Sequence, residues 1–221
     1  MKISLLTFFC LFSLCAYSQV TSFLINDDEL NKPLKDSLES IFKSDQSVRF
    51  AVAEALEAKK PKEYVDSLRE VMRQTDNINL KRVKEIIKEK GWQSPQKVGM
   101  TAAQGLFLVI QHADLQTQLE YLPLIQDVEK KGGILSSNLA ILEDRINARQ
   151  GKTQSFGSQL FTDRKSGKKY PYPIADVDNL DKRRKSMGMT PMQTYLEDWN
   201  VESYKKDLPI IERIFTAQGI R

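Results

Sequence analysis

Apolar residues recur with the period of an α-helix from Asn31 to about residue 150. The first helix is expected to be capped by Asn31, with Pro33 in its first turn. Its apolar face comprises Leu34, Leu38, Ile41 and Phe42. Three further helices are predicted in sequence order: 48–59, one beginning at Pro61, and one from Asp76 or Asn77 to a stop at Gly91.

The helix that opens at Thr101 is apolar on every side through 106–110. We therefore expect it to be central and buried. Asp114 is the predicted cap of the next helix, in which Pro123 should cause a kink or a split. A further helix, capped by Ser136, is expected to end near residue 150.

The pattern changes at 151–178, which are rich in glycine, serine, lysine and proline and have no helical period. Ser166-Gly167 is typical of a hairpin turn, here between strands near 159–161 and 169–172. Short helices are predicted at 179–187, 191–198 and 208–217. The expected fold is mainly α: a single helical domain with one long irregular segment that holds a short β-hairpin. Long segments of this kind are usually functional or disordered.

The N-terminus has the three parts of a secretory signal peptide: Lys2, an apolar run at 3–14, and small residues in Ala16-Tyr17-Ser18. We expect a signal peptide at 1–18 and a mature domain at 19–221, exported to the periplasm or the exterior. The run is too short to span a membrane, and no second apolar stretch follows. A lipoprotein alternative, with Cys15 as the mature N-terminus, is disfavoured because Leu14 precedes it.

Composition removes several classes of function. Lysine and arginine number 33 against 29 acidic residues, and both signs are interspersed, so no nucleic-acid partner is expected. Both cysteines lie in the predicted signal peptide and the chain has one histidine, which excludes a typical zinc site. Asp176, Asp178 and Asp181 do not fit a calcium loop, because Leu180 occupies a ligand position. We predict no metal and no cofactor.

Polar residues end the buried helix in the order Gln111-His112-Ala113-Asp114. His112 is a candidate catalytic residue because an imidazole can act as acid or base near neutral pH. Asp114 is a candidate partner, and Gln111 a candidate ligand-binding residue. A structural alternative weighs about equally, since polar groups on an apolar helix must find hydrogen-bond partners.

A second polar pair, Asp144-Arg145, lies on a later helix with apolar residues on two sides. Asp144 is expected to be buried beside a positive partner, although an exposed carboxylate remains the alternative. Downstream, Gln154 and Gln159 lie in a segment that suits ligand binding, because its glycines permit tight turns and amides offer uncharged donors and acceptors. The same segment fails the patterns of a phosphate-binding loop and of a nucleophile elbow.

Short motifs follow one another in a defined order along the chain. They comprise Asp45-Gln46 with Arg49; Asp76, Asn79 and Arg82; Gly91-Trp92; Val98-Gly99; Gln111 to Asp114; Leu142 to Arg145; Gly151-Lys152 with Gln154, Phe156-Gly157 and Gln159; Pro173-Ile174; Asp176; and Asp181 to Arg184. This ordered set resembles a widespread bacterial family that is classed as a domain of unknown function. The resemblance covers about residues 38–197, and the order of the motifs is more specific than any one of them.

The resemblance implies an α-rich single domain with a shared polar site, and it implies no particular reaction. It adds Asp45, Gln46 and Arg49 to the candidate ligand-binding residues. The chain departs from the family pattern at Phe156 and Ser158, where tyrosine and threonine are more common. Chemistry that depends on that tyrosine hydroxyl would be absent here.

The sequence thus predicts a polar pocket where the His112 helix, the Asp144 helix and the Gln154–Gln159 loop meet. Our interpretation is an acid–base, hydrolase-like enzyme in which His112 is the base and Asp114 or Asp144 orients it. Arg145 or a glutamine would stabilise developing negative charge. The alternatives are a non-catalytic ligand-binding module and a structural or interaction module. The expected partner is a small molecule or peptide.

Overall fold

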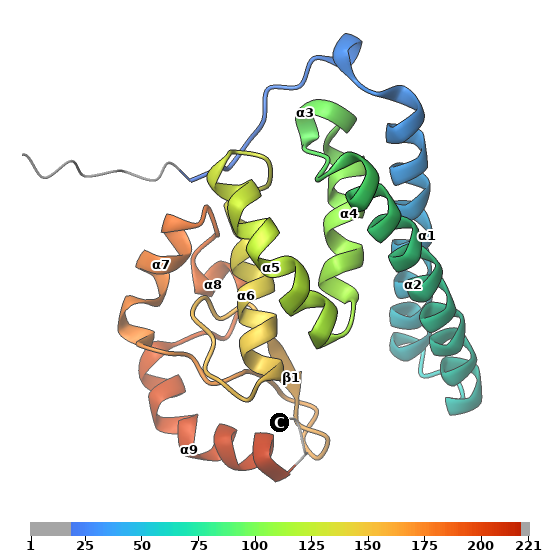
Figure 1. The fold of residues 1–221 in the computed structure, drawn as a ribbon. Coiled ribbons are helices and arrows are strands. Elements are labelled where there is room, and N and C mark those ends of the chain that lie inside the picture. The colour runs from blue at the N-terminus through green and yellow to red at the C-terminus, as the bar shows by residue number, and fades with distance from the viewer. Residues whose placement is uncertain (1–18, 218–221) are drawn as a thin grey trace, which may run out of the picture.

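The computed structural model describes residues 19–217. The predicted signal peptide, with both cysteines, lies outside these residues. The fold is mainly α, as expected (Figure 1). In the described residues the helices are α1 (Lys32–Glu57), α2 (Lys62–Lys90), α3 (Pro95–Val98), α4 (Met100–His112), α5 (Leu115–Lys130), α6 (Ser136–Arg149), α7 (Leu180–Ser186), α8 (Met192–Tyr195) and α9 (Val201–Ala217).

The predicted central helix, α4, packs against α1, α2, α3 and α5 (Figure 1). Its buried residues include Leu106, Phe107 and Ile110, each at most 1% exposed. They form one apolar core with Leu38 and Ile41 of α1 and with residues of α2, α5 and α6. Burial on several sides explains why this helix is apolar all the way round.

Two long helices replace four predicted ones. The chain is helical without interruption through α1 and through α2, so the breaks predicted before Val48 and at Asp76 or Asn77 are wrong. The stop at Gly91 is confirmed, because this glycine has a positive φ of 70° and its N–H bonds to the carbonyl of Ile87. Helix α2 then needs no internal cap.

Helices α5 and α6 confirm the predicted segments but correct two details. Asp114 caps α5, accepting a hydrogen bond of 2.7 Å from the Thr117 N–H. The helix continues through Pro123, so of the two predicted effects, a kink or a split, the split is wrong. Ser136 is the first residue of α6 and not its cap, because its hydroxyl donates to Glu129 and accepts from the Val20 N–H.

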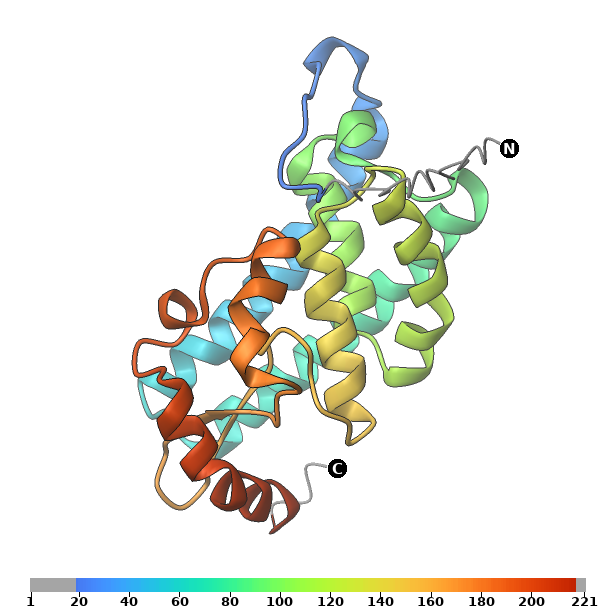
Figure 2. The ribbon, with the colours of Figure 1, turned by 90° about the vertical axis from the view of Figure 1, so that its left-hand side faces the viewer.

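The C-terminal part has a second, smaller apolar core. In Figure 2 this part of the chain, in orange and red, lies beside α6. The predicted hairpin is confirmed: β1 (Leu160–Thr162) pairs antiparallel with β2 (Lys169–Pro171). A short 3-10 turn at Val177–Asn179 precedes α7. The last helix begins at Val201 rather than near 208, and it includes Pro209. The core comprises Phe161, Ile174, Leu180, Met192, Trp199, Tyr204, Ile211 and Phe215.

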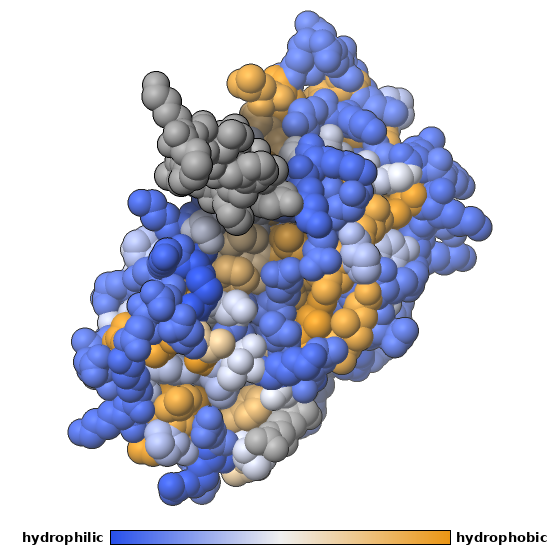
Figure 3. Space-filling model, turned by 60° about the vertical axis from the view of Figure 1, so that its left-hand side comes forward, coloured by the Kyte–Doolittle hydropathy of each residue, from blue (hydrophilic) through white to orange (hydrophobic). Residues whose placement is uncertain are grey.

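Hydrophilic side chains cover much of the face in Figure 3, with smaller apolar patches between them. Within residues 19–217, every helix is too short or too polar to cross a membrane.

Candidate functional site

His112 pairs with a buried carboxylate on α1. Its Nδ1 lies 3.1 Å from Oδ1 of Asp45, which is 67 residues away in the sequence. Asp45 is 1% exposed, whereas the His112 side chain is 16% exposed. A carboxylate accepts but cannot donate, so the pair is a hydrogen bond when Nδ1 carries the proton. The remaining ring nitrogen, Nε2, is then free to accept a proton.

Two further side chains hold the Asp45 carboxylate. Arg49, one turn along α1, donates to both of its oxygens at 3.2 and 3.3 Å, and Gln46 donates to Oδ2 at 2.6 Å. Burial alone would raise the pKa of Asp45, but the hydrogen bonds from His112 and Arg49 outweigh it and lower the pKa to about 2. Asp45 is therefore charged at neutral pH.

Arg49 extends the cluster to α2, where it contacts Asp76 at 2.6 Å. Nearby, Asn79 of α2 donates to the Ser44 hydroxyl of α1 at 3.0 Å. These contacts join α1, α2 and α4 through polar side chains. We call Asp45, Gln46, Arg49, Asp76 and His112 the His112 cluster.

Helix packing places His112 opposite Asp45. Gly105 of α4 lies against Leu38 and Phe42 of α1, where an added Cβ would be 2.8 Å from the Leu38 carbonyl oxygen. His112 follows Gly105 by seven residues, and Asp45 follows Leu38 by seven. Since two helical turns span about seven residues, parallel α1 and α4 bring this pair together two turns beyond the close contact (Figure 1).

A hollow of about 230 Å³ opens beside the pair. Asp114 lies at its edge, and the hydrogen bond from the Thr117 N–H lowers the pKa of this exposed carboxyl. The described residues that line the hollow are Asp45, Arg73, Asp76, Asn77, Leu80, Val109, His112, Ala113 and Asp114. Across residues 19–217, no three His, Cys, Asp or Glu side chains are grouped so as to hold a metal ion.

Asp144 has a different place. It is fully buried, as predicted, but its partners are backbone amides: Ser155, Phe156 and Ser158 donate to it at 2.7 to 3.2 Å. The prediction that Asp144 lies beside a positively charged partner is wrong. Burial raises the pKa of Asp144, and these hydrogen bonds oppose the shift. Asp144 thus fixes the loop that follows α6, and it is not the carboxylate that contacts His112.

Gln154 also serves this loop. Its side chain is fully buried, donates to the carbonyls of Gln159 and Tyr172 at 3.1 and 2.9 Å, and accepts from the Gln159 N–H at 2.8 Å. A ligand would have to displace these bonds. Gln111 is buried as well, and its backbone carbonyl accepts a hydrogen bond of 2.5 Å from the side-chain amide of Gln118.

Arg145 and Gln159 line another hollow, of about 550 Å³, between α6, the loop, α7 and α8. The pocket expected to unite His112, Asp144 and the loop is therefore divided. His112 and Asp114 line one hollow, and Arg145 and Gln159 line the other. Sequence reasoning missed Arg184 and Tyr195 in this second hollow, because a buried arginine has no periodic signal on a short charged helix.

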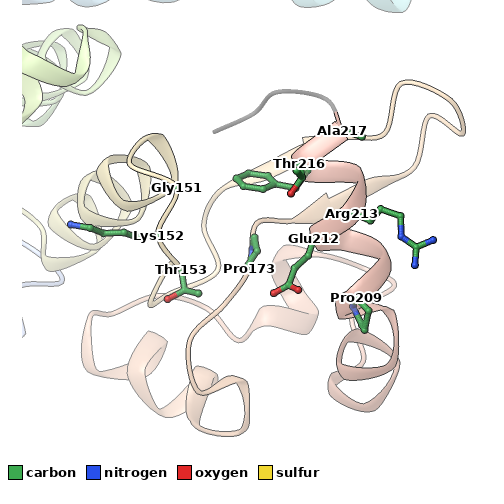
Figure 4. Close-up of a pocket in the computed structure, with 10 residues that line it drawn as sticks. Gly151, Lys152, Thr153, Pro173, Pro209, Glu212, Arg213, Thr216 and Ala217 are labelled. Atoms are coloured by element: carbon green, nitrogen blue, oxygen red, sulfur yellow. The ribbon is translucent and has the colours of Figure 1, made fainter.

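A third hollow, of about 630 Å³, lies between residues 151–153 and α9. Lys152 and Arg213 point away from one another there, and the predicted site residues do not line it (Figure 4). It brings no set of charged groups to one point, so it is a weaker candidate than the His112 cluster.

Comparison with known proteins gives one family. No curated protein and no solved structure matches the chain. A model described as a family of unknown function (DUF6624) matches residues 32–205, which include the His112 cluster, the Asp144 loop and Arg184. The match confirms the resemblance seen in the order of the motifs, and the chain belongs to this family of unknown function, DUF6624.

Proposed function

We propose that the protein is an exported acid–base enzyme, hydrolase-like in its chemistry, with His112 as general base. The observation that carries the proposal is the 3.1 Å contact between His112 Nδ1 and buried Asp45, beside an open hollow. Asp45 orients the ring and stabilises the protonated imidazole, which is the role of the carboxylate in a histidine–carboxylate pair.

Water is the proposed nucleophile. The described lining of the hollow contains no serine, threonine, cysteine, lysine or tyrosine that could form a covalent intermediate. Its carboxylates, Asp45, Asp76 and Asp114, are engaged by Arg49 or by the Thr117 N–H. His112 Nε2 would take a proton from a water molecule as it attacks the substrate. The protonated ring would then return that proton to the leaving group, which balances the step.

Since His112 is the only histidine in the chain, its tautomer can be measured directly. Long-range ¹H–¹⁵N NMR at a pH where the ring is neutral should show the proton on Nδ1. A proton on Nε2 would contradict the assignment of His112 as base, because the lone pair of the ring would then lie on Nδ1, against the Asp45 carboxylate.

Turnover of chromogenic esters, amides and glycosides tests the reaction. We expect turnover of at least one of these classes. His112→Gln should reduce it at least about 100-fold, and exposed Asp127→Asn should leave it unchanged. Turnover by the His112→Gln variant at the wild-type rate would contradict the proposal.

A structural role for the cluster is the second candidate, because Arg49 joins α1 to α2 and His112 joins α4 to α1. Unfolding separates the two candidates. If the cluster serves a site, His112→Gln should keep most stability, because an amide can still donate to Asp45. A loss of about 3 kcal/mol or more would favour the structural role.

Export rests on the pattern of Lys2, the apolar run at 3–14 and Ala16-Tyr17-Ser18. The processed protein should begin at Gln19. N-terminal sequencing of protein recovered from the periplasm or the medium tests this. A chain that retains Met1, or one that starts at acylated Cys15, would contradict it.

A further inference from the structure

Arg145 is a half-buried cation that lacks a hydrogen-bond or ion-pair partner among the described residues. Within the described residues, it has no hydrogen bond or ion pair, and its Nε is enclosed with no acceptor. Burial lowers the pKa of Arg145, and the charges of Arg149 and Arg49 lower it further. An enclosed guanidinium N–H without an acceptor is unfavourable unless a ligand or water supplies one.

A second guanidinium faces the same hollow. Arg184 of α7 is 1% exposed and is held by hydrogen bonds to the carbonyls of Phe156 and Thr190, at 2.6 and 2.7 Å. Its guanidinium carbon also lies 5.2 Å from the centre of the Tyr195 ring. These contacts fix the orientation of Arg184 and engage its Nε and Nη1, which leaves Nη2 for another acceptor.

The lining of this hollow is positive. In the described part of the chain it contains Arg145 and Arg184 but no aspartate or glutamate. Uncharged donors complete it: Ser137 from α6, Ser158 and Gln159 from the loop, Thr190, and Tyr195 from α8. Asp144, the nearest carboxylate in sequence, is engaged by the loop amides. Residues of α6, α7 and α8 all line this hollow.

We propose that this hollow binds a small organic molecule through a carboxylate or phosphate group, which Arg145 and Arg184 contact. A planar guanidinium matches the two oxygens of such a group, and two of them would neutralise its charge. The volume, about 550 Å³, exceeds that of a bare ion, so the hydroxyl and amide groups at the rim would contact the rest of the ligand. This site is separate from the hollow beside His112.

Succinate and inorganic phosphate are suitable probes, because they present the two candidate groups on small molecules. Calorimetric titration at constant ionic strength should give saturable binding of at least one, with a dissociation constant below about 10 mM. In ¹H–¹⁵N spectra of the wild-type protein, the Nε–H resonance of Arg145 should shift along the same curve. Stronger binding of succinate indicates a carboxylate ligand, and stronger binding of phosphate indicates a phosphate ligand.

Arg145→Gln should weaken this binding at least about tenfold. Arg149→Gln is the matched control: it removes the same charge one turn along α6, but Arg149 donates to the Ala113 carbonyl and does not line the hollow. His112→Gln should also bind normally, which separates this proposal from the acid–base function. Absence of saturable binding by both probes, or equal weakening by both arginine substitutions, would overturn it.

Discussion

Asp45 and Asp144 are both buried carboxylates, yet their pKa values move in opposite directions. Burial raises both, but Asp45 also receives hydrogen bonds from Arg49 and His112, and its pKa falls to about 2. Asp144 receives hydrogen bonds from uncharged groups, namely backbone N–H groups of the loop and the side chain of Ser158, and its pKa stays raised. Charged donors stabilise an ionised carboxylate more strongly than neutral ones do. Asp45 is therefore suited to stabilise a positive charge on His112, whereas Asp144 is suited to hold the loop that follows α6.

The lowered pKa of Asp45 predicts acid sensitivity. The folded value of about 2 lies below the reference value of 3.8, so the unfolded state takes up this proton first as pH falls. The contribution of Asp45 is present above about pH 4 and is lost as pH falls to about 2, by about 2 kcal/mol. Urea unfolding at a series of pH values measures it.

Asp45→Asn provides the comparison, since it removes the titrating group. The difference in unfolding free energy between wild type and this variant should shrink as pH falls from about 4 to about 2. A difference that stays constant over this range would show that Asp45 does not have a lowered pKa in the folded protein.

Asp144→Ala should destabilise the protein by about 3 kcal/mol or more, because three backbone N–H groups would lose their acceptor in a buried loop. Asp181→Ala is a graded control, since exposed Asp181 accepts from one N–H, that of Met192. It should cost about 1 kcal/mol. Equal effects in chemical unfolding would mean that the Asp144 loop is not organised by its carboxylate.

At the scale of elements, the mistaken helix breaks coincide with the His112 cluster. The apolar stripe of α1 is interrupted around Asp45 and Gln46, and that of α2 around Arg73 and Asp76. Sequence periodicity therefore predicted an end to each helix there. The structure keeps both helices continuous, because these polar groups find partners in one another and at the hollow. The caps, the hairpin and the buried α4 were predictable because their signals are local.

Gly105→Ala tests the packing that aligns α1 with α4. Alanine favours a helix over glycine by about 1 kcal/mol. The added Cβ would lie 2.8 Å from the Leu38 carbonyl oxygen and 2.9 Å from Phe42 Cβ, contacts that require the helices to separate. We expect the clash to prevail, with a net loss of about 1–3 kcal/mol in unfolding free energy.

Thr101→Ala, at an exposed position of the same helix, should change stability by less than about 0.5 kcal/mol. Separation of the helices should also weaken the His112–Asp45 contact, which NMR of the single histidine can follow. A stabilised Gly105→Ala variant would mean that the two helices are not closely packed at this point.

For the whole molecule, the sequence named several residues that line the two hollows, but it did not show how they are grouped. His112 was recognisable as the only histidine, and Asp45 through its family motif, yet 67 residues separate them. Their contact depends on how α1 packs against α4. Arg145 and Arg184 likewise line one hollow although 39 residues separate them, which depends on how the segment with α7 packs in the fold. Local patterns carry no information about such long-range packing.

The N-terminal segment ties the predicted start of the mature chain to α6. The Val20 N–H donates to the Ser136 hydroxyl at 2.8 Å, and the Ser136 N–H donates to the Val20 carbonyl at 3.0 Å. A mature chain that begins at Gln19 keeps both bonds, whereas one that begins at Thr21 loses them. The shorter chain should therefore be less stable by about 1–2 kcal/mol.

A double-mutant cycle in urea unfolding isolates this contact. Ser136→Ala removes the hydroxyl that accepts from Val20 and donates to Glu129, so it should be costlier in the chain that starts at Gln19 than in the chain that starts at Thr21. The coupling should be about 1 kcal/mol, because only the longer chain loses the Val20 bond. Additive effects, within about 0.3 kcal/mol, would show that the segment is not held by Ser136. Coupling of the expected size would mean that a chain processed after Ser18 keeps the contact between Val20 and Ser136.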